Sequence, residues 1–271
     1  MTLITMKNYC FTLAYNLPSE TEKVTKLLYE QNQPGTFEHT IFDLGFPIVT
    51  GDEVPKSLEG AKKINSSKLI EIAARYGSNY AVMENIGVSQ NWTQAYQYLK
   101  PENTDVLIGC DPDEHPLNIG WVEKMGNAIR QGDFGLASLM MTDHVDIVRD
   151  FPKSEMWFGG ARVYIFPGQA LNWALIGLSG RLLNLIKEIP YPPKAQRYGW
   201  IEGSLAPKIT EAGMRCCILP DYKVRHTDFE LGDPGTSSLL REWKNQIIFN
   251  IHQYGQMSFD SFLMMRKEGR I

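Results

Sequence analysis

The chain has 271 residues, of which 43% are hydrophobic, enough to bury a sizeable core in one large α/β domain or two small ones. It carries 27 Lys and Arg against 31 Asp and Glu, and the net charge of -4 excludes a global basic field that would attract nucleic acid. A membrane span needs about 18 to 20 apolar residues without interruption, and the apolar stretch 170–186 is broken by Asn172, Arg181 and Asn184. We therefore expect no transmembrane segment and, without a secretory-type leader, a cytoplasmic location.

The four cysteines show no CxxC spacing that would indicate a metal site or a redox pair. Cys216 and Cys217 are adjacent, which disfavours a disulfide between them. We expect all four, Cys10 and Cys110 included, to be reduced thiols in the core.

The first 140 residues alternate between β-rich runs and helical patterns. A strand around residues 10–15 precedes a helix from about Glu20, and a second strand, 37–46, carries Asp43 near its end. Residues 47–66 lack periodicity and predict a long, mobile loop. The next predicted elements are a helix at 68–75, a strand at 80–85, a helix at 89–99, a strand at 104–110, a helix at 119–130 and a strand at 134–141. This alternation predicts a mostly parallel sheet with helices on both faces.

The second half has weaker periodicity. We expect an irregular stretch at 157–160, a strand at 161–166, an apolar helix near 170–176 and a Pro-rich loop at 189–193. The last predicted elements are a helix at 204–212 closed by Gly213, a strand at 216–226 and a helix at 238–251. No internal repeat or low-complexity tract is visible.

Acidic residues follow several of the predicted strands. Asp43 lies near the end of the second strand, Asp111 and Asp113 follow the strand 104–110, and Glu202 lies just before a helix. Ligands of open α/β sheets bind at the carboxyl ends of the strands. The sequence has no GxGxxG and no GxxxxGK[ST], which counts against dinucleotide oxidoreductases and P-loop enzymes. Any bound phosphate must be held in another way.

The D-P-D triplet offers such a device. Asp111 and Asp113, separated by Pro112, can coordinate one hard divalent cation, which in turn can hold a diphosphate that the acids alone would repel. A bare D-x-D triplet is more often a solvated turn, so the metal-site interpretation depends on the rest of the chain.

Five segments, in order, resemble glycosyltransferases of the GT-A fold, especially glycosyltransferase family 2. They lie within residues 9–228 and read CFTLAYNLPSE, FEHTIFDLGF, ENIGVSQNWTQAYQYL, TDVLIGCDPDEHPLNIGWVEKM and YGWIEGSLAPKITEAGMRCCILPDYKVRH. The resemblance implies an α/β, Rossmann-like, mostly parallel central sheet flanked by helices, with a C-terminal acceptor-side region. It further implies a nucleotide-sugar-binding half at 1–140 and an acceptor-binding half plus C-terminal helix at 141–271. The chain departs from the family in having Ile201 and Glu202 where two adjacent acids are usual, and a single Asp at the end of the second strand.

The resemblance also implies roles for individual residues. The implied metal ligands, for Mn or Mg, are Asp111, Asp113 and His226. The implied donor-binding residues are Tyr15, Asn16, Asp43, Asn85, Asp111 and Arg225. The implied acceptor-binding residues are Trp157, Phe158, Gly159 and Trp200. Glu202 is the candidate general base. Each has a structural alternative: a turn cap for Asp43, a helix-terminal charge for Glu202, and core packing for the aromatic rings.

The function that follows is metal-dependent transfer of a sugar from a nucleoside diphosphate sugar, expected to be a UDP-sugar, to an acceptor hydroxyl. A base at Glu202, across the sugar from the metal, implies an inverting outcome. We expect a saccharide or glycoconjugate acceptor. Basic and aromatic residues mixed in the C-terminal third also admit a hydroxylated DNA base, as in some viral enzymes. Two alternatives stay open: a nucleotidyltransferase, although the glycine-rich basic loop is missing, and a non-catalytic carbohydrate-binding relative.

Overall fold

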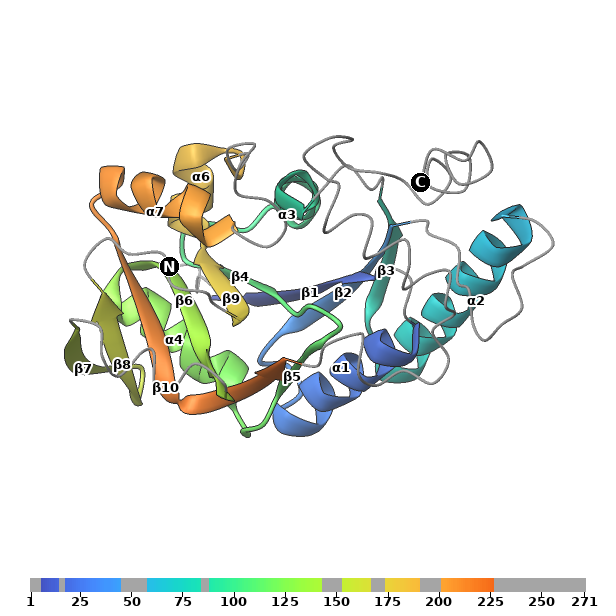
Figure 1. The fold of residues 1–271 in the computed structure, drawn as a ribbon, viewed down its shortest axis with the longest axis horizontal. Coiled ribbons are helices and arrows are strands. Elements are labelled where there is room, and N and C mark those ends of the chain that lie inside the picture. Colours follow the sequence, from blue (N-terminus) through green and yellow to red (C-terminus); the bar gives the residue numbers. More distant parts are fainter. Residues whose placement is uncertain are drawn as a thin grey trace, which may run out of the picture.

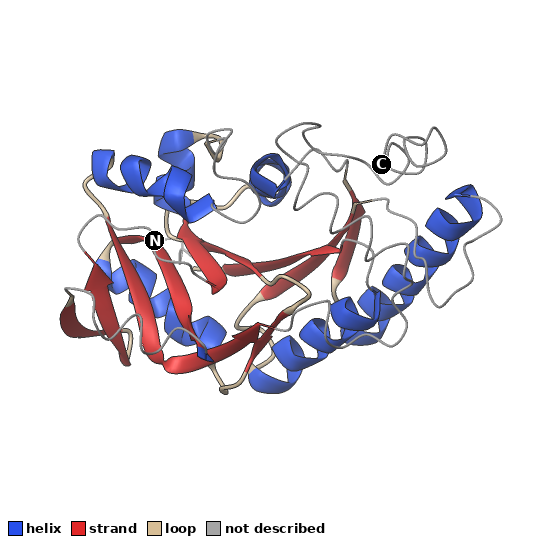
Figure 2. Ribbon diagram, viewed as in Figure 1, coloured by secondary structure: helices blue, strands red, loops and turns tan. Residues whose placement is uncertain are grey.

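The structure is a computed structural model that describes residues 6–14, 18–44, 58–83, 88–142, 153–166, 174–190 and 201–226. One continuous sheet lies between two layers of helices (Figure 1, Figure 2). The strands are β1 (Asn8–Ala14), β2 (Glu38–Asp43), β3 (Asn79–Val82), β4 (Val106–Gly109), β5 (Glu114–Pro116), β6 (Phe134–Met141), β7 (Ser154–Phe158), β8 (Ala161–Phe166), β9 (Ala174–Ser179) and β10 (Arg215–His226). The helices are α1 (Pro18–Gln31), α2 (Leu58–Tyr76), α3 (Val88–Leu99), α4 (Trp121–Gly132), α6 (Gly180–Ile186) and α7 (Ile201–Glu211).

The sheet of the described residues has the strand order β3-β2-β1-β4-β9-β6-β10-β8-β7, and β5 pairs with the end of β10. Strands β1, β2, β3 and β4 are mutually parallel, and β6 is parallel to β10. Strand β9 runs antiparallel between β4 and β6, so these two also share one direction. The predicted α/β arrangement with a mostly parallel central sheet is confirmed.

Each face of the sheet is covered by its own helices. On one face α3, α6 and α7 bury side chains such as Trp92, Leu182 and Leu205 against the sheet. On the other face α1, α2 and α4 do the same (Figure 2). The fully buried Trp121 is the first residue of α4. Burying both faces requires near-continuous apolar strands, and VLIG of β4 is fully buried.

Gly109 allows α3 to approach the last residue of β4. A Cβ atom at Gly109 would lie 2.2 Å from the Trp92 ring, which is closer than atoms can pack. Trp92 is held in turn by Phe11 of β1, whose ring centroid is 4.6 Å away in an edge-on arrangement. The end of β4 is therefore packed tightly between a strand and a helix.

Several predicted elements differ from the structure. The apolar run that predicts a helix near 170–176 contains the start of strand β9, because a short apolar segment can be either element and only its place between β4 and β6 decides. The helix α2 begins at Leu58, inside the predicted loop 47–66. The predicted irregular stretch contains the end of strand β7 and a two-residue turn in which Gly159 and Gly160 both have positive φ, the geometry of a type I′ hairpin. The segments 47–57, 191–193 and 238–251 lie outside the described residues.

The expectation for the cysteines is met. All four cysteines are free and buried, and burial raises the pKa of the Cys216 thiol to about 12. None of the helices in the described part of the chain is both long enough and apolar enough to cross a lipid bilayer.

His39 lies in a buried polar network between β1, β2 and the residue before β3. Its Nε2 atom is 3.1 Å from the Thr12 hydroxyl and its Nδ1 atom is 2.8 Å from the Ser78 hydroxyl, which also contacts Tyr29. Burial lowers the pKa of His39 to about 3, so the folded protein keeps this imidazole neutral.

This network makes the stability depend on pH. Between pH 6.5 and about 3, the unfolded state binds a proton at His39 that the folded state does not. The free energy of unfolding should therefore fall with decreasing pH in this window, by at most about 1.4 kcal/mol per pH unit from this residue. Urea unfolding of the wild type and His39→Gln at pH 7 and pH 5 measures the difference. Equal losses in the two proteins would show that His39 is not the source.

Candidate functional site

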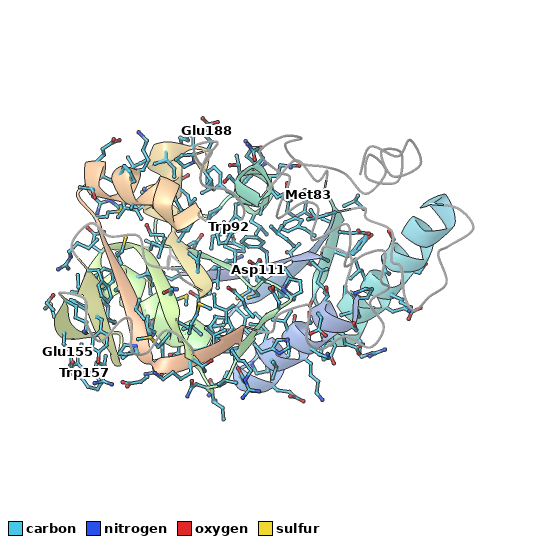
Figure 3. The ribbon with its side chains drawn as sticks, viewed as in Figure 1. Met83, Trp92, Asp111, Glu155, Trp157 and Glu188 are labelled. Carbon is cyan, nitrogen blue, oxygen red and sulfur yellow. The ribbon has the colours of Figure 1, made fainter. Side chains whose placement is uncertain are left out.

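Residues 111–114, which we call the acid turn, directly follow β4 at its carboxyl end. The Glu114 backbone N–H donates a hydrogen bond of 3.0 Å to the Asp111 carbonyl oxygen, which closes a four-residue turn. The side chains of Asp111 and Asp113 are half-buried, and Pro112 between them is buried. Figure 3 shows Asp111 in the middle of the molecule, between the two helix layers. The acids thus lie where open α/β sheets bind ligands.

Strand pairing brings His226 to the acid turn. β5 pairs antiparallel with β10, and in this register His226 lies opposite Glu114, the residue after Asp113. Carboxylate and imidazole side chains are ligand types that suit Mn²⁺ and, less closely, Mg²⁺. Among the side chains that the structure describes, no group of three or more His, Cys, Asp or Glu is placed to hold a metal ion, and the His226 side chain lies outside that set.

A β-bulge in β9 lies beside the acid turn. Ser138 of β6 pairs with Ile176 and Leu139 pairs with Ala174, so Leu175 is an extra residue in the ladder. Leu175 has a φ of 48°, a left-handed conformation that costs a residue with a Cβ atom about 1–2 kcal/mol. Its backbone N–H donates a hydrogen bond of 2.8 Å to Oε2 of the buried Glu114 side chain. This contact was not predicted from the sequence, because residues 170–176 were expected to form a helix and not part of a strand.

A second carboxylate supports the acid turn from α1. Glu20 is buried in the first turn of α1, with its Oε2 atom 3.4 Å from Nε2 of His115 in β5, and it also forms an ion pair with Lys23. Burial raises the pKa of Glu20, but the interactions with His115 and Lys23 outweigh it and the net pKa is lowered. The ionised carboxylate links the start of α1 to the strand that follows the acid turn.

Asp43 lies at the end of β2, as expected, but the residue is only 1% exposed. Its Oδ2 atom accepts hydrogen bonds from the Ser66 hydroxyl of α2, at 2.6 Å, and the Tyr80 hydroxyl of β3, at 2.8 Å. Burial, followed by the hydrogen bond to Asp43, raises the pKa of Tyr80 to about 12, which keeps the phenol a donor. The carboxylate therefore joins α2 and β3 to β2, and its contact with a nucleotide stays a prediction.

The remaining predicted donor and catalytic residues are described only in part. Arg225 is exposed and lies opposite His115 in the β5–β10 pair. Glu202 is the second residue of α7, which leads directly into the start of β10, so the first turn of α7 is the end nearer the acid turn (Figure 1). The Glu202 side chain is outside the described residues, as are Tyr15, Asn16, Asn85 and Trp200.

The three other predicted acceptor residues are not brought to the acid turn. Trp157 is 68% exposed on the edge strand β7, at the left margin of Figure 3 and away from Asp111. Phe158 packs edge-on against Phe134, with ring centroids 5.4 Å apart, and the Gly159 N–H donates to a Gln131 side chain of α4. These contacts are those of a β-hairpin packed on α4, and they give no support to acceptor binding.

Comparison with solved structures identifies the fold. A mannosyltransferase, PcManGT from Pyrobaculum calidifontis in complex with GDP-Man and Mn²⁺, superimposes with a TM-score of 0.55 at 17% identity, covering 83% of this chain and 58% of that one. TarS 1-349 from S. aureus gives a TM-score of 0.51 at 16% identity, covering 82% of this chain and 60% of that one. The chain has the GT-A glycosyltransferase fold. It spans less than two thirds of the length of either structure. No protein-family model matches the sequence, and no significant relative is found among curated proteins.

The buried Asp43 carboxylate gives a stability prediction. Tyr80→Phe removes one hydroxyl donor and leaves part of the carboxylate unsatisfied, so the free energy of unfolding should fall by about 1–3 kcal/mol. Tyr98→Phe is the control, because the Tyr98 side chain is 56% exposed and packs its ring on Phe42. Urea unfolding of both variants should show the loss for Tyr80→Phe alone; equal stabilities would contradict the role of this hydrogen bond.

Proposed function

We propose that the chain is a glycosyltransferase that uses a divalent metal ion to transfer a sugar from a nucleoside diphosphate sugar to an acceptor hydroxyl. The observation that carries the proposal is the acid turn, with Asp111 and Asp113 at the carboxyl end of β4 in a GT-A fold. PcManGT, with the same fold, was solved with a nucleotide sugar and Mn²⁺. A saccharide or glycoconjugate is the proposed acceptor class.

In the proposed mechanism Asp111, Asp113 and His226 hold the metal ion, which when bound neutralises the charge that develops on the diphosphate. Asp43 and Arg225 bind the base and the phosphates of the donor. Glu202 accepts the proton of the acceptor hydroxyl while its oxygen attacks the anomeric carbon. The bond from that carbon to the phosphate oxygen breaks, and the nucleoside diphosphate leaves. Attack from the side opposite the leaving group inverts the anomeric centre.

The proposed donor contacts are made to the base and the phosphates. They therefore bear on which nucleotide the donor carries, and not on which sugar. The sequence favours a UDP-sugar, whereas PcManGT was solved with GDP-Man. A panel of UDP-sugars and GDP-mannose, incubated with the protein and Mn²⁺, resolves the choice through the nucleotide that is released. Release with neither nucleotide class, at any Mn²⁺ concentration, would refute the proposed function.

Asp113→Asn tests the metal site. Replacing one ligand carboxylate by an amide should remove several kcal/mol of charge stabilisation and lower Mn²⁺-dependent release of the nucleotide by at least about 100-fold. Asp221→Asn is the matched control, because Asp221 is an exposed acid of β10 that bonds Arg162. Turnover is measured with and without EDTA. Wild-type activity in Asp113→Asn would exclude the acid turn as the metal site.

Glu202→Gln tests the general base separately. The amide cannot accept the acceptor proton, so kcat for transfer should fall by about 10²–10⁴-fold while the donor still binds. Transfer rates give kcat, and titration with the nucleoside diphosphate in the presence of Mn²⁺ gives the affinity. A parallel loss of both would indicate a binding role for Glu202, and no loss of kcat would exclude it as the base.

A further inference from the structure

The backbone of Glu114 is connected to each of the three predicted metal ligands, although Glu114 is not one of them. Its backbone N–H closes the acid turn on the Asp111 carbonyl, it follows Asp113 in the chain, and its strand partner in β10 is His226. All three predicted ligands are therefore joined to this one residue, each in a different way.

The Glu114 side chain is buried and accepts a backbone hydrogen bond. It is 8% exposed, and its Oε2 atom accepts the Leu175 N–H at 2.8 Å. Leu175 is the extra residue of the β9 bulge, so its N–H has lost its regular place in the ladder with β6. A buried N–H needs an acceptor, and the Glu114 carboxylate supplies one.

The contact also explains how a leucine holds a left-handed conformation there. Leu175 is fully buried with a φ of 48°, which such a residue keeps only where its surroundings enforce it. The carboxylate fixes the N–H on one side, and the apolar core fixes the side chain on the other. The hydrogen bond thus ties the acid turn to a rigid point of the central sheet.

We propose that Glu114 is a positioning residue, whose buried carboxylate anchors the acid turn to the β9 bulge at Leu175 and so sets the geometry of Asp111, Asp113 and His226. This inference rests on the proposed function, since it concerns the same metal site. In this role Glu114 acts through the length of its side chain and its hydrogen bond to Leu175. Its negative charge does not contact the metal ion.

Three substitutions separate these roles. Glu114→Gln keeps the length of the side chain and an oxygen acceptor but removes the charge. Glu114→Asp keeps the charge but is one methylene too short to reach Leu175. Glu114→Ala removes both. Anchoring predicts that Gln preserves the site and that Asp and Ala impair it; direct ligation predicts the reverse order for Gln and Asp.

The matched control is Asp105→Ala at the other end of β4. Asp105 is also a buried carboxylate that accepts backbone N–H groups, from Lys7 and Glu102, both at 2.8 Å. Its loss should destabilise the sheet as the loss of Glu114 does, but far from the acid turn.

The readout is the affinity for Mn²⁺ in the presence of UDP or GDP, whichever the wild type releases, measured from the paramagnetic resonance signal of free Mn²⁺ alongside thermal unfolding. We expect Glu114→Asp and Glu114→Ala to weaken Mn²⁺ binding by about 10- to 100-fold, the range seen when a group that orients a metal ligand is lost. Glu114→Gln and Asp105→Ala should keep most of the affinity.

Three results would overturn the inference. Glu114→Gln weaker than Glu114→Asp would make Glu114 a ligand, and an equal loss in Asp105→Ala would make the effect general destabilisation. Wild-type Mn²⁺ affinity in Glu114→Asp would show that the hydrogen bond to Leu175 is not required for metal binding. If Glu114→Ala does not fold, Glu114→Asp alone tests the inference. If the wild type itself binds no Mn²⁺ with either nucleotide, the proposed function fails and the inference with it.

Discussion

The concentration of carboxylates at one end of β4 is the constraint on which the proposed site depends. Asp111, Asp113 and Glu114 lie within four residues, and like charges this close repel one another unless donors or a cation stabilise them. The protein satisfies Glu114 with the Leu175 N–H and closes the turn with a backbone hydrogen bond. Backbone hydrogen bonds thereby fix both the acid turn and the buried Glu114 carboxylate.

The core makes this arrangement rigid. β4 is buried on both faces, and Trp92 packs so closely over Gly109 that any side chain there would displace it. Close packing of this kind transmits small shifts rather than absorbing them. The position of the acid turn is therefore set jointly by the helix layer above the sheet, by the bulge in β9 and by the strand β10 beside it.

The sequence predicted those parts of the proposed site whose residues are neighbours in the chain. The D-P-D triplet and its place after an apolar strand could be read directly, and the resemblance added His226, whose backbone does lie opposite Glu114. The roles of Glu114 and Glu20 could not be read, because their partners Leu175 and His115 are far away in the chain. The aromatic residues at 157 and 158 were assigned to the acceptor side from the resemblance, and the hairpin that carries them packs on α4, away from the acid turn.

The amino-acid sequence by itself determined the alternation of apolar strands and amphipathic helices, and with it the α/β class and the carboxyl end as the place for acids, since these follow from local periodicity. Only the tertiary structure decided that ALIGLS becomes a strand, that it enters the sheet antiparallel between β4 and β6, and that its bulge meets Glu114. Apolar runs of this length suit either a strand or a helix, and the choice is made by the hydrogen-bonding partners that the rest of the fold supplies.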